Sequence, residues 1–341
     1  MRVAELAATE TVEIRERDRP EPGPSEVLVR VDACGVCTTD LHAYRGALDV
    51  EHPRVLGHES AGEIVAIGAE VDRLENGDRV AINPSVPCYE CRRCRHGREN
   101  LCPDLTSIGG AAPTTVDGAF AEYVAAPSTN VEPIDDLPAT VAAFAEPLGC
   151  CVHAVDRLGV AAGDAVAVIG AGPIGLLLVQ TLRVHGVGPI VVSEPVDDRR
   201  ELALDLGADV AIDPTRDEPS AAIAESVGRV NAAIEAVGRR RTIQQAHELT
   251  CRGGTTLVFG VPPHDATIEL SPFDLFYDER RLEGTYSLTP ESFSRAVALL
   301  CHHRIDVDRL VTDEYRLEEL DRAFDRLADG DGLKAMVYPQ R

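Results

Sequence analysis

The stretch DAVAVIGAGPIGLLLVQTLRVHG, residues 164–186, decides the fold of this chain. An apolar run typical of a buried strand ends at Gly170, the spacing G-x-G-x-x-G occupies residues 170–175, and an apolar run of helical length continues to Gly186. A lone glycine motif is weak evidence, but one placed between a strand and a helix indicates a dinucleotide-binding βαβ unit. The stretch therefore predicts a strand, a tight turn, and a helix whose N-terminus faces phosphates.

The positions of the glycine motif have separate physical reasons. Gly170 makes the turn, Gly172 lets the backbone approach a pyrophosphate, and Gly175 permits tight packing of the helix against the strand. Pro173 and Ile174 complete the motif and begin the helix. The alternative is a glycine-rich turn without a ligand, which the strand–helix context disfavours. We therefore expect these five residues to bind a dinucleotide.

An acidic residue, Glu194, closes the next apolar run, 19 positions after Gly175. A carboxylate there would accept both hydroxyls of the adenosine ribose and would repel a 2′-phosphate, so NAD is favoured over NADP. Arg199 and Arg200 follow closely and could bind a 2′-phosphate if Glu194 turned away, which leaves NADP as the alternative. The simpler role of Arg199 is stacking on the adenine ring.

The rest of the chain divides into two kinds of pattern. From about residue 150 to 285, strand-like and helix-like runs alternate, which predicts a parallel, doubly wound sheet. Before residue 150, short Val- and Ile-rich runs bounded by Gly, Pro, Asn and Asp predict a β-rich region. After about residue 285, mixed structure returns, with a helix from Pro290 to about His303 and a final strand in KAMVYP, residues 334–339.

A polar loop holds four cysteines within fifteen residues, in the spacing C-x2-C-x2-C-x7-C. Four thiolates close the coordination shell of a structural zinc, and the arginines of the loop can offset the negative charge of the cluster. Two disulfides are the alternative, but they require an oxidising compartment, and the opening MRVAELAATE has no apolar export signal. We therefore expect a structural zinc bound by Cys88, Cys91, Cys94 and Cys102.

The charge of the chain excludes some classes of partner. The 341 residues carry a net charge of −24, and Lys334 is the only lysine. Such a surface repels nucleic acid and anionic membranes, and no apolar run reaches the roughly 18 residues of a membrane span. A GC-rich genome would explain the preference for arginine. Acidity together with lysine depletion instead favours a halophilic, cytoplasmic protein whose carboxylates hold water in high salt.

A second set of ligand-type residues is mixed in chemistry. Cys37, His58 and Glu59 lie in two separate segments, and Glu146 lies in a third. A zinc bound by cysteine, histidine and carboxylate keeps a position open for substrate, which is typical of catalytic rather than structural zinc. Each residue has an ordinary alternative: a cysteine in the core, or a histidine that only donates hydrogen bonds. Together they predict a catalytic zinc site.

The chain resembles the zinc-dependent medium-chain alcohol dehydrogenases. Glu146 stands where simple alcohol dehydrogenases carry a cysteine, and this resembles the branch of sorbitol, other polyol and L-threonine dehydrogenases. The matching segments are GVCTTDLH (35–42), GHE (57–59), the four-cysteine loop, AEPLGC (145–150) and GAGPIG (170–175). The resemblance implies an α/β protein with a GroES-like catalytic domain in residues 1–150 and 285–341, containing the zinc loop 84–104. A Rossmann domain would occupy residues 151–284.

The resemblance also implies roles for individual residues. Cys37, His58 and Glu59 match catalytic-zinc ligand positions, and Glu146 would bind the zinc directly or through a water. The metal would lower the pKa of a bound alcohol. Thr39 would take the hydroxyl proton and pass it, through the nicotinamide ribose, towards His42 at the solvent. The alternatives are a turn-capping hydroxyl for Thr39 and a surface imidazole for His42. Asp40 would anchor the backbone or support the zinc site.

The implied activity is hydride transfer from a polyol or secondary alcohol to NAD, with two zinc ions per subunit. Three alternatives remain: L-threonine 3-dehydrogenase, an aldose 1-dehydrogenase using NAD or NADP, and a non-enzymatic NAD(P)-binding relative. Sorbitol itself is in doubt, because Ser287 and Leu288 stand where sorbitol dehydrogenases carry an Arg-Tyr pair that contacts substrate. The resemblance further implies a homotetramer or homodimer, and the apolar runs near 254–286 could pair across a two-fold axis.

Overall fold

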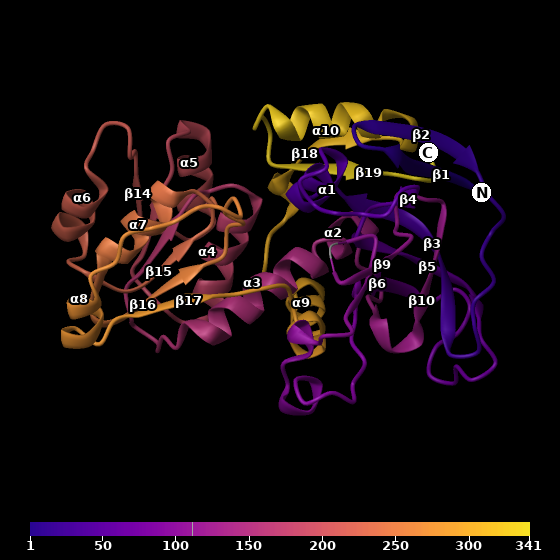
Figure 1. Ribbon diagram of the computed structural model, residues 1–341, viewed down its shortest axis with the longest axis horizontal. Helices are drawn as coiled ribbons and strands as arrows, with labels where there is room; N and C mark the ends of the chain where they lie inside the picture. The colour runs from indigo at the N-terminus through magenta and orange to yellow at the C-terminus, as the bar shows by residue number, and fades with distance from the viewer. Residues whose placement is uncertain (111) are drawn as a thin grey trace. The chain divides into compact units, whose positions relative to one another are not determined.

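The computed structural model describes residues 1–110 and 112–341, which form two compact units (Figure 1). Unit 1 contains Met1–Gly149 and Leu288–Arg341, and unit 2 contains Cys150–Ser287. Both ends of the chain therefore build unit 1, and the middle of the chain builds unit 2. Helix α3 (Ala145–Leu158) contains the point where the chain passes from one unit to the other.

Unit 1 is rich in short strands, as the sequence predicted for the N-terminal region. Its strands are β1 (Arg2–Ala8), β2 (Thr11–Glu16), β3 (Glu26–Gly35), β4 (Arg54–Val55), β5 (Glu59–Ile67), β6 (Arg79–Ile82), β7 (Ser85–Val86), β8 (Thr106–Ile108), β9 (Thr114–Val116), β10 (Tyr123–Pro127), β11 (Val131–Pro133), β18 (Val311–Tyr315) and β19 (Lys334–Val337). Its α-helices are α1 (Thr38–Tyr44), α2 (Ala139–Ala142), α9 (Pro290–Cys301) and α10 (Leu320–Ala328), and its short 3-10 turns are η1 (Cys94–His96), η2 (Glu99–Leu101), η3 (Ser128–Asn130), η4 (Asp308–Leu310) and η5 (Leu317–Glu319).

The main sheet of unit 1 joins the two ends of the chain. Its strand order is β11-β6-β5-β3-β19-β18, and β10 also pairs with β3. Strand β19 runs antiparallel to β3, with Met336 opposite Gly35, so the yellow C-terminal strand lies beside an indigo N-terminal one in Figure 1. The alternating Val and Ala residues of β3 are buried along almost its whole length, which matches the apolar pattern of the segment.

The core of unit 1 gathers around this sheet. Phe120 and Phe324 are fully buried, and their rings meet edge to face with 6.4 Å between centroids. Tyr44 of α1 packs on the same Phe324 at 4.8 Å, so α1 and α10 are held together by aromatic contact. This contact fixes the helix that begins directly after Cys37.

Unit 2 is a six-stranded parallel sheet in the order β14-β13-β12-β15-β16-β17. Its strands are β12 (Val166–Ile169), β13 (Ile190–Ser193), β14 (Val210–Ile212), β15 (Val230–Glu235), β16 (Thr250–Val258) and β17 (Arg281–Gly284), and its helices are the second part of α3, then α4 (Pro173–His185), α5 (Asp197–Asp205), α6 (Pro219–Ser226), α7 (Arg240–Leu249) and α8 (Pro272–Tyr277). The predicted alternation of strand and helix is confirmed, and the fold is a Rossmann-type α/β sheet.

The strand order locates the place where a ligand can bind in unit 2. From β12 the chain first adds β13 and β14 on one side and then β15, β16 and β17 on the other. Helix α4 contacts α5, and α6 contacts α7. Right-handed crossovers place these two pairs on opposite faces, so the chain leaves a crevice at the carboxyl ends of β12 and β15. The predicted glycine motif follows β12 directly.

No helix in the two described ranges is long and apolar enough to span a lipid bilayer.

Candidate active site and metal centres

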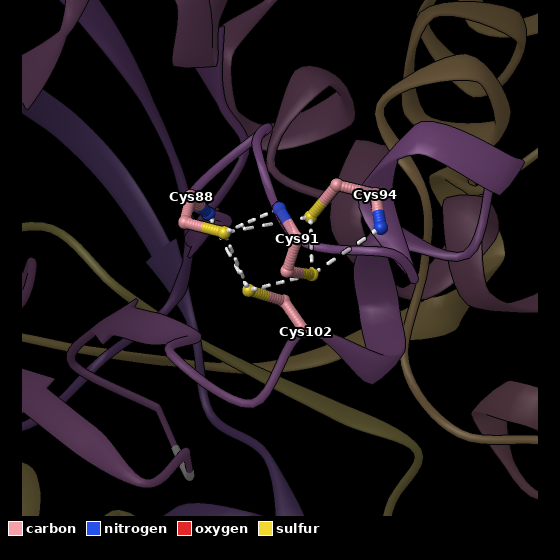
Figure 2. Close-up of side chains that lie close together, drawn as sticks. All are labelled: Cys88, Cys91, Cys94 and Cys102. Atoms are coloured by element: carbon pink, nitrogen blue, oxygen red, sulfur yellow. Dashed lines mark hydrogen bonds between the residues drawn. The ribbon is translucent and has the colours of Figure 1, made fainter.

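The four cysteines of the polar loop converge on one point (Figure 2). Four of their Sγ–Sγ distances are 3.5, 3.5, 4.0 and 4.0 Å. A tetrahedron with zinc–sulfur bonds of about 2.3 Å has sulfur–sulfur edges of roughly 3.8 Å, whereas a disulfide would need about 2.0 Å. The arrangement therefore fits a tetrahedral zinc and is incompatible with the disulfide alternative.

Backbone N–H groups of the loop donate hydrogen bonds to the cysteine sulfur atoms. The N–H groups of Cys88, Cys91 and Cys94 donate to the sulfurs of Cys102, Cys88 and Cys91 at 3.3–3.5 Å. Backbone N–H groups of Glu90 and Cys91 lower the pKa of Cys88 to about 7, whereas burial raises the pKa of Cys94 to about 12. Thiols this close cannot all ionise without a cation between them, so the cluster could hold a metal ion.

A second group of ligand-type atoms lies in unit 1. One ligand atom each from Cys37, His58 and Glu59 falls within a set whose members all lie within 4.8 Å of one another. Cys37 caps the N-terminus of α1, and its Sγ accepts from the N–H of Thr39 at 3.5 Å. His58 and Glu59 stand at the start of β5, which pairs with β3. Strand pairing thus brings the two sequence segments together.

A glycine makes this approach possible. Gly57, directly before His58, has a φ of +94°, and a Cβ there would lie 2.8 Å from the backbone nitrogen of Phe120. Only glycine fits both the backbone angle and the space.

The buried side chain of Asp40 contacts both segments that carry Cys37 and His58. Its side chain is 1% exposed and accepts from the N–H of Cys37 at 2.9 Å and from the N–H of Gly57 at 3.3 Å. Its Oδ1 also lies 3.3 Å from Nδ1 of His58, a buried nitrogen that has no hydrogen-bond partner among the described residues. Burial lowers the pKa of His58, but the charges of Asp40 and Cys37 outweigh it and raise that pKa well above its usual value. Asp40 therefore ties both ligand segments together.

Lys334 of β19 places a positive charge beside the Glu59 carboxylate. Its Nζ donates to both carboxylate oxygens of Glu59, at 2.8 and 2.7 Å, and to the carbonyl of Val36 at 3.3 Å. Burial lowers the pKa of Lys334, but the Glu59 carboxylate outweighs this and raises it above the usual value. Sequence reasoning did not assign Lys334 to the site. The signal was present in its being the only lysine in a chain otherwise supplied with arginine.

The other predicted residues of this site are placed less directly. Glu146 lies in the first turn of α3, outside the group of three, and its charge acts on Lys334. Thr39 and His42 both lie on α1, with His42 in its last turn, and both side chains are partly exposed. Thus Thr39 and His42 start from the same short helix that Cys37 caps.

The glycine turn of unit 2 has the form expected for a phosphate-binding loop. Gly170 has a φ of +99°, and a Cβ at Gly175 would lie 2.0 Å from the carbonyl oxygen of Gly170. At Gly172, the N-cap of α4, a Cβ would meet nothing within 4 Å, and no side chain caps the helix. Gly175 is therefore needed for packing within the protein. Open space at Gly172, beside uncapped N–H groups, fits a dinucleotide pyrophosphate.

Glu194 stands directly after β13 and is 4% exposed. Its carboxylate accepts from the N–H of Ala171 at 2.7 Å and from the N–H of Val196 at 3.0 Å. Arg199 lies on α5 with its side chain partly buried. Arg200 donates to the Glu194 carbonyl at 2.6 Å and pairs with Asp197, so its guanidinium is engaged within the protein.

A buried carboxylate, Glu235, was missed by sequence reasoning. It ends β15, is fully buried, and its Oε1 accepts from the N–H of Val237, the N–H of Gly238 and the hydroxyl of Thr242. Its Oε2 has no partner among the described residues. Glu235 thereby fixes the turn that carries Val237 over Gly170. An acidic residue at the end of an apolar strand was the available signal.

The fold and the two sites define a dehydrogenase with a Rossmann-type unit and metal-ligand clusters in a separate, β-rich unit. Two family matches agree with this class. Residues 23–136 match the alcohol dehydrogenase GroES-like domain, and residues 173–301 match the zinc-binding dehydrogenase domain.

Individual relatives cover nearly the whole chain. The sorbitol dehydrogenase of Bacillus subtilis is 34% identical over 351 residues, which is 100% of this chain and 98% of the relative. An L-threonine 3-dehydrogenase of Thermococcus kodakarensis is 30% identical, covering 96% of this chain and 95% of that protein. A solved zinc-binding dehydrogenase of Sinorhizobium meliloti, with NADP bound, superposes with a TM-score of 0.94 at 36% identity, over 99% of each chain. The chain belongs to the zinc-dependent medium-chain alcohol dehydrogenase family and is an oxidoreductase.

Proposed function

We propose that this protein oxidises a polyol or secondary alcohol to the ketone, with NAD as the hydride acceptor. The observation that carries the proposal is the group of a half-buried Cys37 and the buried His58 and Glu59, whose ligand atoms lie within 4.8 Å of one another. A thiol, an imidazole and a carboxylate suit a zinc with an open position for substrate. The polyol class is supported by the likeness to sorbitol dehydrogenase over the whole chain.

The zinc ligands are Cys37 and His58, with Glu59 or Glu146 supplying the carboxylate. When bound there, zinc supplies Lewis-acid chemistry that lowers the pKa of an alcohol hydroxyl. The Asp40 carboxylate lies beside Nδ1 of His58 and accepts from the N–H of Cys37, so it supports the segments that carry both ligands. The four-cysteine loop holds the second, structural zinc.

The proton leaves through α1. Thr39 is two residues from Cys37, and its hydroxyl would take the substrate proton while releasing its own proton onward, towards His42. His42, in the last turn of the same helix and partly exposed, passes a proton to solvent. Bound NAD supplies the hydride acceptor, and the residues of unit 2 position it.

NAD is proposed over NADP because of Glu194. Its buried carboxylate stands at the carboxyl end of β13, where it would meet a 2′-phosphate with like charge. The neighbouring cation Arg200 is already engaged by Asp197 and by the Glu194 carbonyl. NADP in the Sinorhizobium relative is the reason to test this point. We expect Glu194→Gln to lower the ratio of kcat/KM for NAD to that for NADP by about 10- to 100-fold, or ~1.4–2.7 kcal/mol.

A control distinguishes recognition from damage to the turn. Glu201→Gln, at an exposed carboxylate of helix α5, should leave the NAD/NADP ratio unchanged. An unchanged ratio in Glu194→Gln, with the fold intact, would contradict the assignment of Glu194.

L-threonine is the second candidate substrate, supported by the Thermococcus relative. Its carboxylate would need a cation. Lys334, the only lysine, is engaged by Glu59 and Val36, and this favours an uncharged polyol or secondary alcohol. An aldose with NADP is the third candidate.

The deciding experiment is a substrate panel. Polyols, secondary alcohols, L-threonine and aldoses are each assayed with NAD and NADP for reduced cofactor, in low and in molar KCl. Turnover of a polyol or secondary alcohol with NAD is the expected result. Turnover only of L-threonine, or only of aldoses with NADP, would replace the proposed substrate class. No turnover in zinc-replete protein would contradict the proposed reaction.

We also propose that the protein is a homo-oligomer, as a tetramer or a dimer. Strand β17 ends the sheet of unit 2, and the nearby exposed side chains of Phe273, Phe276 and Tyr277 are aromatic. Exposed apolar groups beside an edge strand favour pairing with a second copy. Light scattering on purified protein measures this directly.

A further inference from the structure

Lys334 holds an unusual position for a lysine. The chain has 33 basic residues of the Lys and Arg types, and only this one is lysine. The residue is 5% exposed, in a protein whose charges are otherwise mostly at the surface. The three N–H donors of its ammonium match three acceptors: both oxygens of Glu59 and the carbonyl of Val36. A compact ammonium suits this pocket better than a planar guanidinium. All the other basic residues of these two types are arginines, which carry a guanidinium.

The partner of Lys334 is the carboxylate that also stands beside Cys37 and His58. Both oxygens of Glu59 face one ammonium at 2.8 and 2.7 Å, and one of them belongs to the group of metal-ligand atoms. A carboxylate oxygen whose lone pairs accept hydrogen bonds from a lysine donates less electron density to a metal ion. The positive charge of Lys334 also opposes a nearby dication.

We propose that Lys334 competes with the metal ion for Glu59 and so sets how tightly the Cys37–His58 site holds zinc. In the metal-free protein Lys334 neutralises a buried carboxylate, which would otherwise be costly to bury. When Glu59 turns an oxygen to the metal, Lys334 loses part of its hydrogen bonding. This inference rests on the proposed zinc site and adds the residue that regulates its affinity.

Competition between Lys334 and the metal ion for Glu59 predicts opposite effects of Lys334→Met on the stability of the zinc-depleted protein and on its affinity for zinc. Lys334→Met leaves Glu59 without its cation, so the zinc-depleted protein becomes less stable. The same change frees Glu59 for the metal, so zinc binds more tightly, by about 5- to 150-fold if the coupling lies in the usual range. A lysine with a merely structural role would weaken both stability and zinc binding.

The first experiment measures zinc affinity on the full chain. Chelator competition removes the more weakly held zinc while the four-cysteine zinc is retained, and retention of that zinc reports that each variant is folded. Arg30→Met is the matched control, since Arg30 pairs with Glu63 across the same strands β3 and β5 and the charge change is equal. We expect tighter zinc in Lys334→Met, wild-type affinity in Arg30→Met, and no effect of Lys334→Met when Glu59→Gln is also present.

The second experiment uses the uniqueness of Lys334. Protein grown with isotope-labelled lysine gives a single side-chain NMR signal. Titration with zinc should shift this signal in the wild type and leave it nearly unmoved in Glu59→Gln, because only the wild-type carboxylate can be shared.

The outcomes separate this inference from the proposed function. Weaker or unchanged zinc affinity in Lys334→Met, or an NMR signal that zinc does not move, would overturn the competition while leaving zinc-dependent turnover intact. A protein that binds only one zinc per chain, and turns over nothing on the panel, would instead contradict the proposed function itself.

Discussion

Cys37 contributes to the site in two ways, as a candidate ligand and as the cap of α1. Its Sγ accepts from the N–H of Thr39, and its own N–H donates to Asp40. Serine keeps the capping geometry but is a poorer zinc ligand. We therefore expect Cys37→Ser to retain the fold, to lower bound zinc from two to one per chain, and to reduce kcat by about 10³-fold or more, since ~4 kcal/mol of transition-state stabilisation is lost. Metal analysis and steady-state kinetics check this.

Another cysteine supplies the control for this change. Cys251 is partly exposed in unit 2 and belongs to neither cluster, so Cys251→Ser should keep both zinc ions and full activity. Full activity in Cys37→Ser would remove Cys37 from the proposed metal site.

At the scale of the element, the turn from β12 to α4 offers a matched pair of substitutions. Gly175→Ala places a Cβ 2.0 Å from the carbonyl of Gly170, whereas Gly172→Ala meets no protein atom within 4 Å. We expect Gly175→Ala to destabilise the protein by about 1–3 kcal/mol, because overpacking shifts the backbone. Gly172→Ala should melt like the wild type but raise the KM for NAD several-fold. Thermal melting and cofactor titration distinguish the two.

A different result for Gly172→Ala would contradict its assignment to cofactor binding. If Gly172→Ala also lost stability, or bound NAD normally, the open space at Gly172 would have no role in cofactor binding.

We expect the four-cysteine loop to depend on a bound metal, because the loop has little core. Besides the cysteines, the residues of this small cluster that the structure describes are Leu105 and Ala112. Binding of structural zinc contributes directly to folding. We expect Cys91→Ser to lose one zinc and to lower the melting temperature by about 6–12 °C, which corresponds to roughly 3 kcal/mol in a chain of this size. Zinc analysis and calorimetry check this.

The activity of this variant gives the control. Where Cys91→Ser is still folded at low temperature, its second zinc and its kcat should persist. Wild-type melting of Cys91→Ser would contradict a closed four-sulfur site.

At the scale of the whole molecule, the dominant feature is the net charge of −24. Unpaired carboxylates repel one another over about 10 Å at 0.1 M salt and only about 3 Å at 1 M. We therefore expect the melting temperature to rise between 0.1 and 2 M KCl, measured by calorimetry. Glycerol at equal osmolality should not reproduce the rise if charge screening is the cause. A melting temperature that stays flat or falls in KCl would contradict salt adaptation.

The fold class followed from the sequence because local patterns dictate it. The run to Gly170, the glycines after it and the stop at Gly186 gave β12, the turn and α4 almost to the residue. The helix expected from Pro290 is α9, and the expected final strand is β19. Apolar periodicity and glycine conformation are properties of a few neighbouring residues, so they are readable in one dimension.

The candidate metal residues were also readable, because ligand chemistry restricts residue type and spacing. The loop cysteines and the group of Cys37, His58 and Glu59 were recognised without coordinates. The sequence by itself thus determined the fold class and the chemistry of the candidate metal sites.

Only the tertiary structure decided which buried charged groups lie next to which partners. Lys334 meets Glu59 across 275 positions of sequence because β19 pairs with β3, which in turn pairs with β5. Glu235 likewise gains its meaning from the turn it holds over Gly170. Long-range strand pairing depends on the packing of the whole unit, and no local pattern encodes which buried charge it brings to which partner.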